Sequence, residues 1–104
     1  MKILEQQIIK SILDYLQILE NQGKLFFFRS AAGGIKTADR FFRTGRKGVQ
    51  DITLLIKGRY VAIEVKTETG RQSPEQKEIE NLVSKHGGEY HIVRSFDELR
   101  KLIN

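Results

Sequence analysis

The chain has 104 residues, of which 39% are hydrophobic and 30% charged, and this balance predicts a folded protein with one core rather than a disordered tail. It has no cysteines, which excludes a disulfide framework, a thiol nucleophile and cysteine-ligated zinc or iron–sulfur sites. The formal net charge of +5 favours a polyanionic partner.

The first predicted element is an amphipathic helix from Lys2 to about Gln22. Its apolar residues recur at intervals of three and four, at Ile8, Ile9, Ile12, Leu16 and Leu19. Gly23 fits the left-handed position that follows a helix. Counting back three residues from Ile8 places Glu5 on the buried face near the helix start, where a carboxylate either serves the helix dipole or takes part in a site.

A short aromatic strand from Leu25 to Phe28 leads into the basic part of the chain. Residues 24–50 carry a net charge of +6, whereas residues 1–23 sum to −1 and residues 51–104 to zero. The stretch from Ser30 to Lys47 has little helix or strand periodicity. We therefore interpret it as an anion-binding loop, with an ordinary solvated loop as the alternative.

Residues 51–66 have the pattern of a β-hairpin. A two-residue loop at Gly58-Arg59 places glycine first, as a type II′ turn requires, and this register puts Thr53 opposite Glu64 and Asp51 opposite Lys66. One face then carries Ile52, Leu54, Ile56, Val61, Ile63 and Val65. The other face carries Asp51, Thr53, Leu55, Ala62, Glu64 and Lys66.

The last third of the chain predicts a helix, a strand and a second helix. Ser73, Pro74 and Gln76 form a capping box with proline in the first turn, and Gly87-Gly88 ends that helix. A short strand covers Tyr90 to Val93, and Ser95 to Glu98 is a second capping box that opens the final helix. The expected order is helix, three strands, helix, strand, helix, over a single domain of residues 1–104.

The polar face of the predicted hairpin carries the chemistry. Asp51 and Glu64 lie diagonally across the two strands, so both carboxylates can reach one hard cation such as Mg²⁺. Lys66 projects from the same face, where an ammonium group can orient water and offset charge on a phosphoryl oxygen. The alternative is a solvated face with cross-strand ion pairs.

These residues resemble the PD-(D/E)XK nuclease superfamily, and within it a small stand-alone VRR-NUC domain. The matching pieces span nearly the whole chain and are Glu5, Gly48-Val49-Gln50-Asp51, Glu64-Val65-Lys66, Ser73-x-x-Gln76 and Val93-Arg94. The resemblance implies an α/β fold with a restriction-endonuclease-like αβββαβ core, a mixed four-stranded sheet flanked by helices. Gln50 stands where the superfamily has proline, and Ser95 replaces the second arginine of the Val-Arg-Arg motif.

The resemblance also implies a metal-dependent endodeoxyribonuclease. Its catalytic residues would be Glu5, Asp51, Glu64, Lys66 and Gln76. By the same resemblance, Mg²⁺ or Mn²⁺ would be bound by Asp51, Glu64 and the backbone carbonyl of Val65. Lys66 would position the attacking water.

DNA is the partner that the resemblance implies. Its backbone phosphates would be contacted by Arg29, Lys36, Arg40, Arg43, Arg46, Lys47 and Arg94. Stand-alone members of this size imply a homodimer that cuts Holliday junctions or other branched DNA. A physical reason agrees, since two symmetric nicks need two sites and this chain supplies one.

We expect no membrane association and a cytoplasmic protein of bacterial or phage type. No apolar run reaches the length of a membrane span, and Glu5, Gln6 and Gln7 interrupt a leader-like start. Two other functions stay open: a non-catalytic nucleic-acid-binding module with the same fold, and a restriction-type endonuclease that reads a short sequence. Asp51, Glu64 and Lys66 are all present, which favours an enzyme over the first. No segment beyond the core is available for base readout, which weighs against the second.

Overall fold

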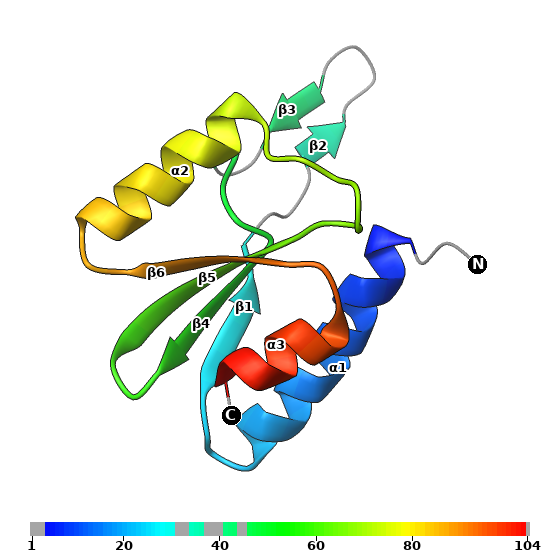
Figure 1. Ribbon diagram of the computed structural model, residues 1–104, viewed down its shortest axis with the longest axis vertical. Coiled ribbons are helices and arrows are strands. Elements are labelled where there is room, and N and C mark those ends of the chain that lie inside the picture. Colours follow the sequence, from blue (N-terminus) through cyan, green and yellow to red (C-terminus); the bar gives the residue numbers. More distant parts are fainter. Residues whose placement is uncertain (1–3, 31–33, 37–40, 44–45, 104) are drawn as a thin grey trace.

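The computed structural model describes residues 4–30, 34–36, 41–43 and 46–103. Along the chain run α1 (Glu5–Asn21), β1 (Phe26–Arg29), β2 (Gly34–Lys36), β3 (Phe41–Arg43), β4 (Ile52–Ile56), β5 (Arg59–Val65), α2 (Pro74–Lys85), β6 (Glu89–Val93) and α3 (Phe96–Ile103) (Figure 1). The predicted order of elements is confirmed, with one addition. The antiparallel pair β2–β3 lies inside the basic stretch that we interpreted as a loop. Each of these two strands is only three residues long, too short for a periodic pattern.

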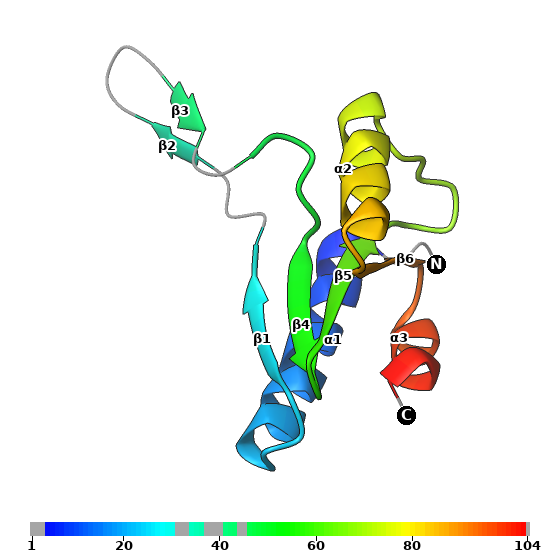
Figure 2. The ribbon, with the colours of Figure 1, turned by 90° about the vertical axis from the view of Figure 1, so that its left-hand side faces the viewer.

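The main sheet is mixed, as expected, with strand order β1-β4-β5-β6. β1, β4 and β5 are antiparallel neighbours, and β6 pairs parallel with β5 after the crossover through α2. α1 and α3 pack against one face of the sheet, and α2 lies against the other face near β6 (Figures 1 and 2). Among the described residues, no helix is both long and apolar enough to cross a membrane.

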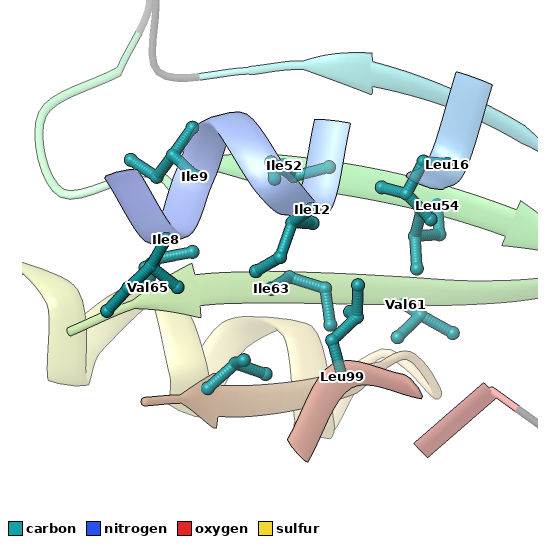
Figure 3. Close-up of a cluster of buried hydrophobic side chains, with 11 residues drawn as sticks. Ile8, Ile9, Ile12, Leu16, Ile52, Leu54, Val61, Ile63, Val65 and Leu99 are labelled. Atoms are coloured by element: carbon teal, nitrogen blue, oxygen red, sulfur yellow. The ribbon is translucent and has the colours of Figure 1, made fainter. Parts of the chain in front are cut away.

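The main core lies between the sheet and the helices α1 and α3. Figure 3 shows apolar side chains of these elements pointing toward one another, and the buried members are Ile8, Ile9, Ile12, Leu16, Ile52, Leu54, Val61, Ile63, Val65, Val93 and Leu99. Removing one such side chain from water contributes about 1.5–3 kcal/mol. The predicted apolar face of the hairpin is confirmed. Its opposite face turns toward α2 and contains the buried residues Thr53, Ala62 and Glu64.

The helix ends follow the sequence signals closely. Gly23 has a φ of 75°, and its N–H donates to the carbonyl of Glu20. In the capping box of α2, the Ser73 Oγ accepts from the Gln76 N–H at 3.2 Å and the Gln76 Oε1 accepts from the Ser73 N–H at 2.9 Å. The second predicted box is half correct. Ser95 Oγ caps the Glu98 N–H, but the Glu98 carboxylate accepts from the N–H of Arg94 instead of Ser95.

The predicted hairpin register is wrong by two residues. The loop is Lys57-Gly58, with positive φ at both positions (49° and 80°), as in a type I′ turn, and not Gly58-Arg59. Ile56 therefore pairs with Arg59, and Thr53 pairs with Ala62 instead of Glu64. A slip of two keeps every side chain on its predicted face. It also places Asp51 opposite Glu64, one step beyond the last ladder pair.

Two interactions favour the observed register over the predicted one. The I′ turn matches the twist of the flanking strands and keeps Ile56 within the ladder. It also puts Arg59 beside Glu89 at the start of β6, where the guanidinium donates to both carboxylate oxygens at 2.7 and 2.8 Å. That contact joins strands 30 residues apart, so local turn preferences alone do not reveal it.

The turn assignment predicts the effect of Lys57→Asn. Asparagine tolerates the left-handed conformation better than lysine, so the free energy of unfolding should rise by about 0.5 kcal/mol. Urea denaturation measures the change, with Lys24→Asn at an exposed position beyond α1 as the control. A loss of stability in Lys57→Asn would support the extended conformation of the Gly58-Arg59 register, in which asparagine is disfavoured.

Candidate active site

Asp51 is half-buried and lies directly before β4, at the end of the sheet. Its Oδ2 accepts a hydrogen bond from the backbone N–H of Val65 at 2.8 Å. The carboxylate thus takes the place of a backbone acceptor just beyond the β4–β5 ladder. This bond fixes Asp51 against the strand that carries Glu64 and Lys66.

Glu64 is 2% exposed and belongs to β5. Its Oε2 accepts from Nε2 of Gln76 at 3.1 Å, and the same oxygen lies 3.7 Å from Nζ of Lys66. The other oxygen, Oε1, is buried and has no hydrogen-bond partner within the described part of the chain. An ionised carboxylate oxygen that is buried without a donor is unfavourable. The Asp51 carboxyl group lies close enough to share a proton with Glu64, so this position favours positive charge.

Gln76 has two roles, one as the cap of α2 and one as a neighbour of the buried carboxylate. Its Oε1 closes the capping box at Ser73, and its Nε2 donates to Glu64. The start of α2 is therefore joined to the buried carboxylate through one side chain. The residue expected from the resemblance lies in contact with the site, and the cap explains how its amide is oriented.

The electrostatics of the site centre on Glu64. Burial raises the pKa of Glu64 to about 8, and the neighbouring Asp51 carboxylate adds to this effect. Lys66 offsets part of the rise, while the charge of Glu5 at the start of α1 adds a smaller increase. Glu64 is thus influenced by Asp51, Lys66 and Glu5, and Gln76 holds one of its oxygens.

The donor set suits a hard divalent cation. Carboxylate oxygens are the ligands that Mg²⁺ and Mn²⁺ prefer, and the partnerless Oε1 of Glu64 is one such donor. In the described ranges, no three Asp, Glu, His or Cys side chains gather closely enough to hold a metal by themselves. Mg²⁺ commonly binds through one or two carboxylates together with water and substrate phosphates, so Asp51 and Glu64 fit this pattern.

The expected phosphate-binding residues are only partly described. Arg46 and Lys47 are about two-thirds exposed and pair with Glu78 and Glu75 of α2 at 3.9 and 3.2 Å. Such exposed pairs contribute little to stability. Arg29 is exposed at the end of β1, Lys36 and Arg43 belong to β2 and β3, and Arg40 lies outside the described residues. Contact of these residues with DNA stays a prediction.

Arg94 has a structural role that the sequence did not reveal. Its Nη1 donates to the backbone carbonyls of Thr67 and Gly70 at 2.6 and 2.8 Å. It thereby holds the loop that follows Lys66 against the end of β6. No pattern in the sequence pairs an arginine with particular backbone carbonyls, which is why this contact was missed. Its contact with DNA stays a prediction.

Gly48 is required where the chain passes the first turn of α2. Its φ is 85°, and a Cβ there would lie 2.6 Å from the backbone carbonyl of Glu75. The segment that leads into Asp51 is therefore packed directly against α2, the helix that also supplies Gln76. Gly48 belongs to the Gly48-Val49-Gln50-Asp51 motif, and the close approach to Glu75 explains why glycine is needed there.

Comparisons with known proteins agree with this fold. A family model of the VRR-NUC domain matches residues 3–97, a range that includes all the residues of the site. A solved structure described as a VRR_NUC domain is similar over 95% of this chain and 92% of its own, at 21% identity and a TM-score of 0.65. At this level of identity the likeness concerns the fold. No curated protein matches the chain.

The raised pKa of Glu64 predicts how stability depends on pH without metal. The folded state keeps the Glu64 proton up to about pH 8, while the unfolded chain releases it near pH 4.5. The free energy of unfolding should therefore fall between these pH values, by at most about 1.4 kcal/mol per pH unit for this one group. Urea denaturation in EDTA from pH 5 to pH 8.5 measures the slope.

Glu64→Gln isolates this contribution, because glutamine stays neutral throughout the range. Its slope should be flatter than that of the wild type, while Glu68→Gln in an exposed loop should keep the wild-type slope. Equal slopes for wild type and Glu64→Gln would mean that Glu64 is already ionised in the metal-free protein.

Proposed function

The chain belongs to the VRR-NUC domain family, a nuclease-type family, and from this premise we propose that it is a divalent-metal-dependent endonuclease that hydrolyses DNA phosphodiesters. The observation that carries the proposal is the buried carboxylate of Glu64, which has one oxygen without a partner and lies beside both Asp51 and Lys66. A purely structural carboxylate in such a position would normally have its hydrogen bonds complete.

The side chains divide the work of hydrolysis among them. A bound Mg²⁺ or Mn²⁺, held by Asp51, Glu64 and the Val65 carbonyl, would supply Lewis-acid polarisation of the phosphate. Lys66 is 14% exposed, so its ammonium group is largely shielded from solvent yet reachable by substrate. It orients the attacking water and offsets the negative charge that grows on the phosphoryl oxygens. Water attacks phosphorus in line as the bond to the leaving oxygen breaks, and the proton that the water loses is balanced by one that the leaving oxygen takes up from solvent.

The supporting residues keep this arrangement fixed. Gln76 holds one oxygen of Glu64, which leaves the other oxygen for the cation. The Val65 N–H holds one oxygen of Asp51 in the same way. Each carboxylate therefore has one oxygen tied to the protein, so little reorganisation is needed when a cation binds. Glu5 adds negative charge from α1, which favours positive charge at Glu64.

We extend the proposal to a homodimer that cuts branched DNA. The sheet face that α2 leaves open carries exposed apolar side chains, and by their register Phe26, Leu55 and Tyr60 lie across three adjacent strands. Next to Tyr60 a groove of about 650 Å³ continues this surface, lined in part by Leu82 and Val83. A second copy would remove this apolar area from water and bring a second site for the second strand.

The nuclease proposal predicts metal-dependent cleavage of a four-way junction that fails in two variants. Asp51→Ala and Lys66→Ala should each lower the rate by at least about 100-fold, because each removes charge aimed at the cation or the phosphoryl oxygens. Lys101→Ala, exposed on α3, is the matched control and should cut like the wild type. Denaturing gels of end-labelled junction, flap and linear duplex, with Mg²⁺ or EDTA, measure the products.

Three results separate the candidate functions. Binding that weakens with salt but gives no metal-dependent product would support the non-catalytic module. Cleavage at one sequence in linear duplex would support the restriction-type enzyme. If Asp51→Ala and Lys66→Ala cut as well as the wild type, the assigned site is wrong.

The homodimer proposal predicts that Leu55→Asp yields a monomer. Burying a new charge at an apolar interface is strongly unfavourable, so sedimentation velocity should show loss of the dimer. Leu4→Asp, at another exposed leucine that lies at the start of α1, should stay dimeric. A wild-type protein that is monomeric at assay concentrations would contradict the dimer and leave the nuclease proposal standing.

A further inference from the structure

The residue before Asp51 is buried and closely bonded. Gln50 is 1% exposed, and its Nε2 donates to Thr53 Oγ1 at 2.8 Å and to Tyr60 Oη at 2.6 Å. The backbone carbonyl of Gln50 accepts from Ser30 Oγ at 2.8 Å. Ser30 Oγ and Thr53 Oγ1 lie 2.9 Å apart. These contacts join the segment before β4 to β4 itself and to the residue that follows β1.

The directions of these hydrogen bonds close a ring. A carbonyl can only accept, so the Ser30 hydroxyl hydrogen points to Gln50. The hydroxyl of Thr53 must then donate to Ser30 Oγ, and Thr53 Oγ1 accepts from the Gln50 amide. Each hydroxyl donates once and accepts once. The side chain of Gln50 is thus bonded, through Thr53 and Ser30, to its own backbone carbonyl, and such closed networks stiffen their members.

The ring acts on Asp51 through the backbone. Ser30 holds the carbonyl of Gln50 through its Oγ and the carbonyl of Asp51 through its N–H, the latter at 2.9 Å. The peptide groups on both sides of the Asp51 Cα are therefore fixed by one residue. The position of the Asp51 carboxylate relative to the Val65 N–H is thereby fixed as well.

We propose that Gln50, Thr53 and Ser30 are positioning residues that hold the Asp51 carboxylate in place for the cation and the substrate. The inference rests on the proposed function, and it assigns a role to the position where the superfamily that this chain resembles has proline. None of the three residues touches the reacting atoms. They act through the backbone of Asp51.

A role in stability alone explains Gln50 poorly. Its Oε1 is buried and has no hydrogen-bond partner among the described residues. A leucine of similar volume would avoid that unfavourable burial. We therefore expect the amide donor of Gln50 to matter more for the site than for the stability of the fold. Residues of this kind are found at functional sites.

The test compares three variants and three readouts. Gln50→Leu and Thr53→Val each break the ring with little change of shape, and Thr53→Ser keeps the hydroxyl. The readouts are amide exchange of Val65 relative to Leu54 without metal, the Kd of the DNA-free protein for Mn²⁺, and kcat and KM for junction cleavage. Melting temperature is recorded for each variant, and Val61→Ala in the core serves as a variant that loses stability without touching the ring.

We expect the ring-breaking variants to change the site more than the fold. Val65 exchange should accelerate about tenfold relative to Leu54, because its acceptor on Asp51 is less fixed. Mn²⁺ affinity and kcat should each fall about 10- to 100-fold, with KM changed less than about twofold. Thr53→Ser should restore near wild-type values. Gln50→Leu should melt within about 5 °C of the wild type.

Other results would contradict either the positioning role of the ring or the proposed function. If Gln50→Leu and Thr53→Val keep wild-type Val65 exchange, Mn²⁺ affinity and kcat, the positioning proposal is wrong. Loss in Thr53→Ser equal to that in Thr53→Val would also overturn it, as would the same pattern in Val61→Ala. If the wild type does not cut DNA, the proposed function fails, while Val65 exchange and Mn²⁺ affinity still decide whether the ring positions Asp51.

Discussion

The site depends on a carboxylate that the fold buries and only half satisfies. Glu64 lies near the end of β5, an inner strand of the sheet. Its burial and the neighbouring Asp51 carboxylate raise its pKa to about 8. An ionised carboxylate in such surroundings is expensive unless opposite charge compensates it. Lys66 compensates in part from 3.7 Å. The protein therefore keeps a binding position that favours positive charge, either a proton or a cation.

The rest of the structure can be understood from this constraint. The apolar face of the β4–β5 hairpin packs on α1 and α3, which anchors the strand that carries Glu64 and Lys66. The other face is turned toward α2, whose capping residue Gln76 reaches Glu64. Gly48 lets the preceding segment approach α2, and Arg94 holds the loop that follows Lys66. Each of these contacts fixes one of the segments that surround Glu64.

The sequence was sufficient for the three helices, the four strands of the main sheet and the two faces of the hairpin, because period-two alternation and capping boxes are local signals. It was insufficient for the register. Both candidate turns contain Gly58, and the deciding contact joins Arg59 to Glu89, far along the chain. The error still left Asp51 and Glu64 on the correct face, because a slip of two preserves the alternation. The strands β2 and β3 were missed because three residues are too few for a pattern.

Long-range hydrogen bonds were the part that no local signal could provide. The bonds of Arg94 to a loop more than 20 residues away, and the ring through Ser30, Gln50 and Thr53, depend on how the strands meet in space. Gln76 was foreseen as a cap from local spacing and as a site residue only from the family resemblance. The contact between its amide and Glu64 joins those two expectations.

In the proposed site, Asp51 and Glu64 together hold a divalent cation through the oxygen of Glu64 that lacks a hydrogen-bond partner among the described residues. The most direct measurement is a crystal structure of the protein soaked in Mn²⁺, with anomalous scattering recorded to locate the metal. We expect an anomalous peak in contact with Glu64 Oε1 and the Asp51 carboxylate, and this peak should disappear in Glu64→Gln. A fully soaked crystal with Mn²⁺ bound elsewhere, and none between these two carboxylates, would contradict it.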